Sequence, residues 1–172
     1  LTICRGVSSR DAMTSLDTPC AARSTIFARM TSRYGDVYLR ALAPNSSRSA
    51  LVSSMTIYNE MLKRRPDLLP HLFEPLHTDR RGEVPAGQKP WHDIPVFNWH
   101  EGRLSALYAR RYIESARRFP EVPPLTREQT EALDLFDALA EDPTINLQMT
   151  FRPGDMQWVH NHTMLHDRTE FE

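Results

Sequence analysis

Six prolines between residues 66 and 95 are the feature that most constrains how this chain can fold. Proline lacks an amide hydrogen and its ring clashes with the preceding helical turn, so it breaks a helix interior and the centre of a sheet. A long helix is therefore excluded in this stretch, and regular structure there is expected only in short pieces. IPVFNW, at residues 94–99, is the best strand candidate within it.

Helical patterns lie on both sides of the proline-rich stretch. SSMTIYNEMLKRRPDLL predicts a helix that begins near Ser53 or Ser54 and ends before Pro66. Its expected core face consists of four residues at helical spacing: Met55, Tyr58, Met61 and Leu62. We expect the methionines to pack in the core, because that is the usual role of methionine at this spacing.

Two further helices are predicted after residue 100. RLSALYARRYIESARRF, at 103–119, places apolar residues on one face and arginines on the other, which predicts an amphipathic helix with a solvated basic face. Thr126 and Gln129 have the spacing of a capping box, so a helix should run from about 127 to 140.

The remaining elements are predicted strands. VYLRALA, at 37–43, is a short strand candidate. NLQMTF, at 146–151, alternates apolar and polar residues, and turn residues follow at 153–155. MQWVHNH would then be the returning strand of a hairpin.

Composition excludes several classes of function. The 172 residues carry a net charge of −1 and 40% apolar residues, so a single globular domain with no nucleic-acid or membrane partner is expected. Cys4 and Cys20 form neither a disulfide framework nor a CxxC pair, and no apolar run is long enough to cross a bilayer. We therefore expect a cytoplasmic protein.

Both ends of the sequence suggest a fragment, because the chain begins at Leu1 and stops directly after a histidine-rich segment. Residues 1–35 show no sustained period and favour a weakly ordered tail. A mitochondrial transit peptide is the alternative, and Asp11 and Asp17 argue against it.

Three histidines in seven positions, His160, His162 and His166, are the first candidate site. On an uninterrupted strand His160 and His162 would share a face and could chelate a metal, but a bend before His166 leaves open which of them act together. Ordinary surface histidines explain such a cluster about equally well. Two histidines with one carboxylate would favour non-haem Fe(II).

The sequence contains one His-x-Asp tripeptide, His77-Thr78-Asp79. Its flanking prolines and the DRRGE run that follows favour an exposed loop, so the tripeptide alone is weak evidence for a metal site. Motifs of other enzyme classes, GxSxG, GxxxxGK[ST], GxGxxG and HExxH, do not occur in the sequence.

From about residue 43 to 172 the sequence resembles the taurine dioxygenase-like (TauD/TfdA) family of Fe(II)/2-oxoglutarate-dependent oxygenases. The matching segments are SSMTIYNEMLKRRPDLL, DRRGEVPAGQKPWHDIPVFNW, RLSALYARRYIESARRFPEVPPLT and FRPGDMQWVHNHTMLHDRTEFE. The family's segment N-x-x-x-LH-x-R, which carries its second metal histidine, is matched by Asn161, Leu165, His166 and Arg168.

The resemblance implies that His166 is an iron ligand and that Asn161 and Arg168 support its strand. It also implies that Ser49, in SSRS, takes the place of the hydroxyl residue that contacts 2-oxoglutarate, although both glycines of the family's Gly-Gly-x-[Ser/Thr] turn are missing. The family's His-x-Asp or His-x-Glu lies before the segment matched by SSMTIYNEM, whereas His77 lies after it, so we interpret the match at His77 as accidental. The family's cosubstrate-binding arginine would fall beyond residue 172.

The implied fold is α+β, a partial double-stranded β-helix (jelly roll) with flanking helices, over residues 41–172, preceded by a poorly defined segment at 1–40. The expected function is that of an Fe(II)/2-oxoglutarate-dependent dioxygenase, incomplete in this chain, that oxidises a small organic substrate and releases succinate and CO2. A catalytically inactive structural or binding domain is the first alternative. A metal site built from His160, His162 and His166 is the second.

Overall fold

The computed structural model describes residues 27–32, 35–41, 48–151 and 155–168. Strands and helices alternate along this part of the chain, with two short 3-10 turns (η) among them. The elements are β1 (Phe27–Ser32), β2 (Gly35–Ala41), β3 (Arg48–Ser53), α1 (Ser54–Arg64), η1 (Pro66–Leu68), α2 (Leu69–Phe73), β4 (Leu76–Asp79), β5 (Trp91–Ile94), β6 (Phe97–His100), β7 (Arg103–Ala106), α3 (Arg110–Ser115), η2 (Ala116–Arg118), α4 (Arg127–Glu141), β8 (Leu147–Thr150), β9 (Met156–His160) and β10 (Met164–Arg168).

Two three-stranded antiparallel sheets are built from segments far apart in the sequence. One has the strand order β1-β2-β9 and the other β10-β3-β8, so β9 and β10, which follow each other in the chain, lie in different sheets. The predicted hairpin between 146–151 and the MQWVHNH strand is wrong, because β8 pairs with β3 and β9 pairs with β2. Local alternation identified these strands, whereas their partners are set by contacts distant in sequence.

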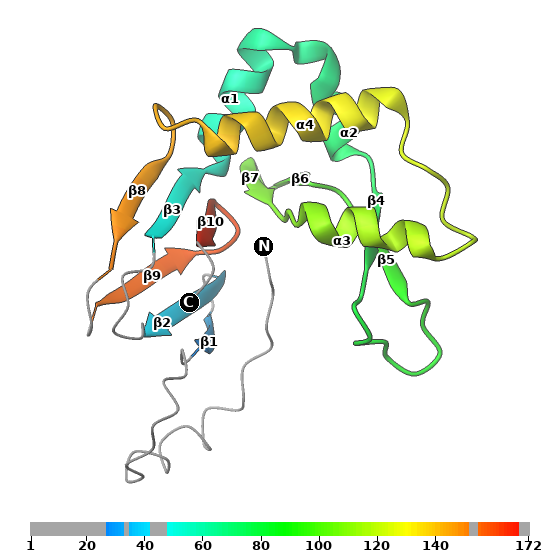
Figure 1. Cartoon of the computed structure of the whole chain (residues 1–172), viewed down its shortest axis with the longest axis horizontal. Coiled ribbons are helices and arrows are strands. Elements are labelled where there is room, and N and C mark those ends of the chain that lie inside the picture. The colour runs from blue at the N-terminus through cyan, green and yellow to red at the C-terminus, as the bar shows by residue number, and fades with distance from the viewer. Residues whose placement is uncertain (1–26, 33–34, 42–47, 152–154, 169–172) are drawn as a thin grey trace, which may run out of the picture.

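A helical layer covers one end of the sheets. In Figure 1, α4 crosses the molecule beside α1 and α2, with α3 running below it. The main core forms where these helices meet the strands and contains Phe97, Phe136, Ile57, Met61, Leu72 and Leu133, all of which are fully buried. The expected mixture of helices and antiparallel strands is thus confirmed.

The first predicted helix is present as α1, but its buried face differs from the expected one. Ile57 and Met61 are fully buried, whereas Met55 and Leu62 are 41% and 50% exposed. Two apolar stripes exist on this helix, and α4 and α2 pack against the one centred on Ile57 and Met61. Core packing is therefore confirmed for Met61 and wrong for Met55.

The predicted helix at 103–119 is wrong in its first part. Residues 103–106 form β7, which pairs with β6 across a turn in which Glu101 and Gly102 both have positive φ. Left-handed residues close a tight hairpin, and Leu104 and Ala106 are buried at the period of a strand. The helix begins only at Arg110.

The proline-rich stretch behaves as expected. Within 66–95 the structure has only η1, α2 and the short strands β4 and β5. The strand predicted at 94–99 is divided by Pro95, with β5 ending at Ile94 and β6 beginning at Phe97. Likewise, the strand predicted at 37–43 is present as β2, and its last two residues lie outside the described part of the chain.

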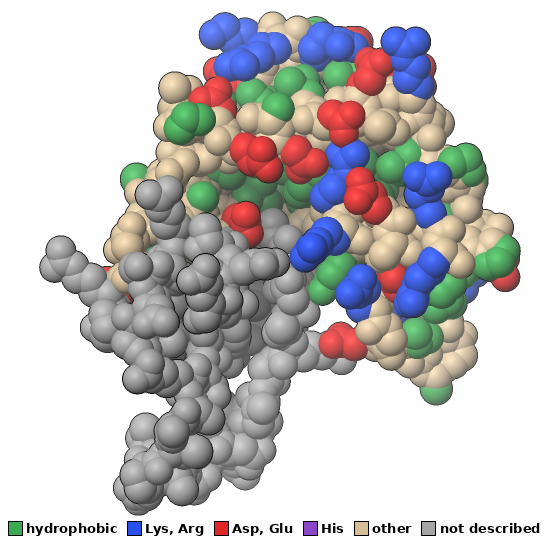
Figure 2. Space-filling view, viewed as in Figure 1, with side chains coloured by type: hydrophobic (Ala, Val, Ile, Leu, Met, Phe, Trp, Pro, Cys, Tyr) green, Lys and Arg blue, Asp and Glu red, His purple; other side chains and the backbone are tan. Residues whose placement is uncertain are grey.

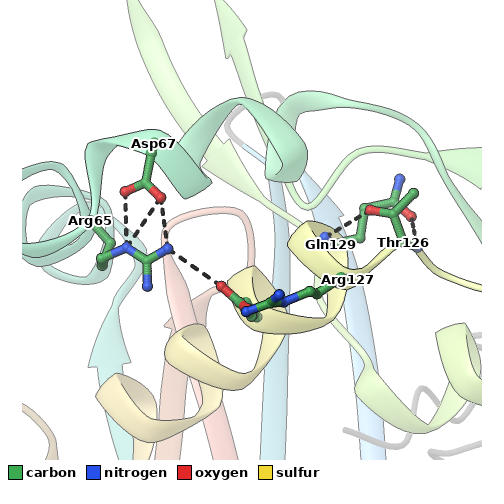
Figure 3. A network of polar contacts seen from close by, with 6 residues as sticks. Arg65, Asp67, Thr126, Arg127 and Gln129 are labelled. Atoms are coloured by element: carbon green, nitrogen blue, oxygen red, sulfur yellow. Dashed lines mark hydrogen bonds and ion pairs between the residues drawn. The ribbon is translucent and has the colours of Figure 1, made fainter.

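The helix predicted at 127–140 is confirmed as α4. Thr126 Oγ1 accepts a hydrogen bond from the Gln129 amide, and the Gln129 side chain accepts one from the Thr126 amide. Arg65 joins this helix to η1, because its guanidinium donates to Asp67 and, at 3.4 Å, to Glu131 (Figure 3). The capping box and the bridge fix where α4 starts over the core.

No helix in the described ranges is both long and apolar enough to cross a membrane. Strand β1 and the start of β2 lie in the segment 1–40, for which the sequence alone predicted a strand only from residue 37. The weakly ordered tail expected over residues 1–35 is wrong for 27–32, which form β1 and pair with β2, whereas residues 1–26, which the transit-peptide hypothesis mainly concerns, lie outside the described residues.

Candidate metal and cosubstrate site

The pairing of β3 with β10 brings the two predicted site residues onto one face. Ser49 lies opposite Arg168, and Leu51 lies opposite His166. Because directly paired residues share a face of the sheet, and residues two apart on a strand do as well, Ser49 and His166 project from the same side. As diagonal neighbours they are separated by about 7–8 Å.

This face is turned toward the second sheet. Ser49 is 2% exposed, and its hydroxyl donates to the Asp167 carbonyl at 3.1 Å and lies 3.4 Å from Oε1 of Gln157 on β9. The Gln157 amide nitrogen in turn lies 3.8 Å from the Met149 sulfur on β8. Ser49 therefore occupies the space between the sheets, where a bound group would be shielded from water.

Gln157 is a residue of this face that the sequence interpretation missed. In the structure Gln157 shares its strand parity with Val159, which is buried, while the intervening Trp158 is 56% exposed; in the sequence both Trp158 and Val159 are apolar, so the facing of the strand was not evident. The prediction had instead used the other parity, which contains Trp158 and His160. The exposed tryptophan shows that His160 belongs to the outer face of β9.

The turn between β9 and β10 is held firmly from outside. The Thr163 carbonyl accepts hydrogen bonds from both the amide and the hydroxyl of Ser54, at 3.0 and 3.1 Å, and the His162 carbonyl accepts one from the Ala106 amide at 2.8 Å. These bonds tie the turn to the start of α1 and to β7. They fix the position from which β10 starts toward His166.

The three C-terminal histidines do not form a joint metal site. His160 ends β9 and its ring nitrogen lies 3.0 Å from the Thr163 hydroxyl, whereas His162 lies in the turn. Their rings are 5.7 Å apart, but no three side chains of the His, Cys, Asp or Glu type are grouped to hold a metal among the residues that the structure describes. The prediction assumed that the strand continues through His162, whereas β9 ends at His160.

The His77-Thr78-Asp79 tripeptide is a strand, so the expected exposed loop is wrong. Asp79 is 1% exposed and accepts hydrogen bonds from Ser115 at 2.9 Å, from Arg118 at 3.1 Å and from the Arg81 amide at 2.8 Å. Burial opposes ionisation of Asp79, but these donors outweigh it and hold the pKa of its carboxyl below the usual value.

His77 also has a local partner, because its Nδ1 pairs with Asp93 across the β4–β5 ladder. Its ring packs edge-on against Trp91 at 6.3 Å. Both ends of the His-x-Asp tripeptide are thus engaged within β4, β5 and the α3–η2 segment.

The described part of the chain does not complete an iron site. A non-haem Fe(II) centre of the two-histidine, one-carboxylate type needs three ligands on one side of the metal. The inward face of β3 and β10 offers His166, and no group of three His, Cys, Asp or Glu side chains that could hold a metal is present among the residues placed by the structure.

The comparison with known proteins identifies the family. The model of the taurine catabolism dioxygenase TauD, TfdA family matches residues 28–172. The chain belongs to the TauD/TfdA family. The match begins before residue 41, and the predicted boundary between 1–40 and 41–172 stays a prediction.

The matches between this TauD/TfdA chain and two curated relatives cover only part of the length of each relative. FR-33289 synthase of Streptomyces rubellomurinus is 35% identical over 124 residues, which are 69% of this chain and 35% of that protein. Taurine hydroxylase-like protein SAT17 of Stachybotrys chartarum is 32% identical over 138 residues, 78% of this chain and 34% of its own length. The chain therefore spans about a third of these relatives.

Solved structures share the fold of this TauD/TfdA chain. An asparagine oxygenase in complex with Fe(II), 2S,3S-3-hydroxyasparagine and succinate has a TM-score of 0.57 at 14% identity, over 87% of this chain and 46% of that one. The non-heme iron oxygenase OrfP in complex with Fe gives 0.56 at 13% identity, over 88% and 47%.

Proposed function

We propose that this chain is part of an Fe(II)/2-oxoglutarate-dependent dioxygenase that oxidises a small organic substrate, with release of succinate and CO2. Membership of the TauD/TfdA family supports this proposal. The observation that carries it is the register of β3 and β10, which places Ser49 and His166 together on the face between the two sheets. A partial double-stranded β-helix would bring such facing sheets around a site. The proposed location of the protein is the cytoplasm.

In this proposal His166 is an iron ligand and Ser49 contacts 2-oxoglutarate. Imidazole nitrogen is a suitable ligand for Fe(II), and a buried hydroxyl can donate to a carboxylate. When bound, the metal and the cosubstrate would supply the oxidising chemistry. The contribution of the described residues is to fix the ligand strand and exclude water, through the Ser54 bonds to the β9–β10 turn and the burial of Ser49.

The inactive-domain hypothesis is a second candidate, favoured by the engagement of His77 and Asp79 by their neighbours. Under this hypothesis the chain would bind neither iron nor 2-oxoglutarate.

Anaerobic calorimetric titration of Fe(II), with and without 2-oxoglutarate, separates the two candidates. Under the dioxygenase proposal, His166→Ala abolishes 2-oxoglutarate-dependent Fe(II) binding, while His160→Ala and His77→Ala leave it intact. Under the inactive-domain hypothesis, the wild type binds no more Fe(II) than His166→Ala does. Loss of binding in His77→Ala together with His166→Ala would restore His77-Thr78-Asp79 as a metal motif.

A further inference from the structure

A hollow of about 310 Å³ lies on the side of the β10-β3-β8 sheet that faces away from Ser49. Ala50 and Val52 of β3 and Leu165 and Asp167 of β10 line it, and these residues have the opposite strand parity to Ser49 and His166. His166 is also among the residues that line the hollow, but in the β3–β10 register its side chain has the parity of Ser49 and belongs to the other face. The hollow is therefore a separate feature from the proposed iron site.

The floor of the hollow is apolar and already packed. Val52, Leu165 and Phe136 line it and are only 5%, 6% and 0% exposed, so their surfaces are held in place by the core. In Figure 2 a hollow with green side chains lies below a group of acidic side chains near the centre of the view. A floor of this kind favours a compact apolar group.

The wall formed by α4 and α3 carries more negative than positive charge. Arg110 donates to Glu114 at 2.7 Å, to Asp134 at 2.8 Å and to Asp137 at 3.1 Å, so its single charge is shared among three carboxylates. Asp137 also accepts a hydrogen bond from Tyr108 at 2.5 Å. The positive charge of Arg110 is thus more than balanced by these acids.

Two further carboxylates line the hollow and add to this excess. Glu141 lies one helical turn after Asp137, and Asp167 projects from β10, and neither forms an ion pair within the described ranges. Arg111 is the only other cation of the lining. Burial, followed by the neighbouring charges of Glu141 and Asp134, raises the pKa of Asp137 although Tyr108 and Arg110 oppose this, as expected where like charges gather.

A buried acceptor completes the lining. The Asn146 amide nitrogen donates to the Ala140 carbonyl at 3.0 Å, which fixes the orientation of the side chain. Its Oδ1 is buried, and no donor reaches it from the residues whose placement is described. A buried acceptor without a donor is costly, and a ligand N–H would satisfy it.

From these contacts we propose that the hollow binds an organic ammonium ion, a protonated amine on a compact apolar body. The apolar group would cover Val52, Leu165 and Phe136, and the ammonium would face the carboxylates of Glu141 and Asp167. A metal ion fits less well, since no three-ligand group is present among the described residues and the floor has no donor atoms. Shape and charge both favour an amine.

Benzylammonium is a suitable probe, with benzyl alcohol and benzoate as neutral and anionic controls of nearly the same shape. Binding to the full chain is measured by calorimetry at neutral pH without added metal, so the result is independent of the iron proposal. We expect benzylammonium to bind and both controls to bind at least threefold more weakly, on the order expected for a partly exposed ion pair.

Two charge-neutralising variants and one control locate the site. Glu141→Gln and Asp167→Asn should each weaken benzylammonium binding by about threefold. Glu128→Gln makes the same change of net charge on the same helix at a residue outside the lining, and it should leave binding unchanged. Thermal unfolding of each variant verifies that the fold is kept.

The proposal is overturned if benzylammonium does not bind, if benzyl alcohol binds equally well, or if Glu128→Gln weakens binding as much as Glu141→Gln. The last result would indicate attraction to the overall charge and no defined site. Loss of Fe(II) binding in the separate His166→Ala titration would neither support nor overturn the proposed ammonium site.

Discussion

Strands β4 and β10 each carry a histidine in a short antiparallel ladder. The comparison between them shows that a tripeptide motif does not identify a metal site unless its structural surroundings are known. On β4, His77 pairs with Asp93 and Asp79 with Ser115 and Arg118, so the chemistry of His-x-Asp is used to hold elements together. On β10, His166 shares an inward face with Ser49 between two sheets. The tripeptide that resembles a metal motif in sequence is engaged by local polar contacts, whereas the lone histidine lies on the face between the two sheets.

The largest expected effect comes from removing the β4 carboxylate. Asp79→Ala removes a buried carboxylate that accepts hydrogen bonds from the Arg81 amide, Ser115 and Arg118, so we expect a loss of about 2–3 kcal/mol in the free energy of unfolding. Urea unfolding followed by circular dichroism measures it. Asp67→Ala, which removes an exposed partner of Arg65, is the control and should cost much less.

An equal cost for the two variants would mean that Asp79 is not the anchor of the β4 region. In that case the contrast between β4, whose His-x-Asp residues have local partners, and β10, the proposed ligand strand, would fail at its first step.

Acid should remove the same contribution. The pKa of Asp79 is lower in the folded chain than in the unfolded one, so its stabilisation is complete above the ordinary aspartate pKa, near 3.8, and is lost as the pH falls through the folded-state value. The difference in unfolding free energy between wild type and Asp79→Asn should therefore shrink below about pH 4. A difference that stays constant from pH 7 to pH 3 would contradict this.

Ser49→Ala tests the inward face of β3. The substitution removes one hydrogen bond to the Asp167 carbonyl, so the expected loss of stability is about 1 kcal/mol. If Ser49 also contacts the cosubstrate, 2-oxoglutarate-dependent Fe(II) binding should weaken more than this small change in stability explains. Ser105→Ala is a matched control, because the Ser105 hydroxyl also donates to a carbonyl but lies in the β6–β7 hairpin.

Local chemistry in the sequence predicted α4 almost to the residue, because Thr126 and Gln129 form a capping box whose geometry depends only on neighbours. The end of α1 before Pro66 was predictable for the same reason. Elements whose secondary structure depends on pairing with another strand were not predictable from the sequence. Residues 103–106 have an apolar pattern compatible with a helix, and their pairing with β6 decides the outcome.

The site shows the same limit. The family resemblance selected Ser49 and His166, but sequence spacing alone could not show that they share a face, since residues 49 and 166 meet only through the β3–β10 register. Strand alternation also favoured the parity of His160 as the inner face of β9. The burial of Val159 shows that the inner face is the one that carries Gln157 and Val159. A shift of one residue along a strand reverses which side chains face inward. Only the pairing of the strands in the sheets shows which set does so.

The smallest expected effect is the one that distinguishes the two histidines most directly. His77→Ala removes a half-exposed cross-strand pair with Asp93, so the loss in unfolding free energy should be about 0.5 kcal/mol, and Fe(II) binding with 2-oxoglutarate should be unchanged. His166→Ala should reverse this pattern, with loss of the metal binding. Because both variants exchange the same residue types on short antiparallel strands, a difference in metal binding between them cannot come from loss of imidazole alone. If both lose stability equally and neither changes Fe(II) binding, β10 is structural in the same sense as β4, and the inactive-domain hypothesis is the one that stands.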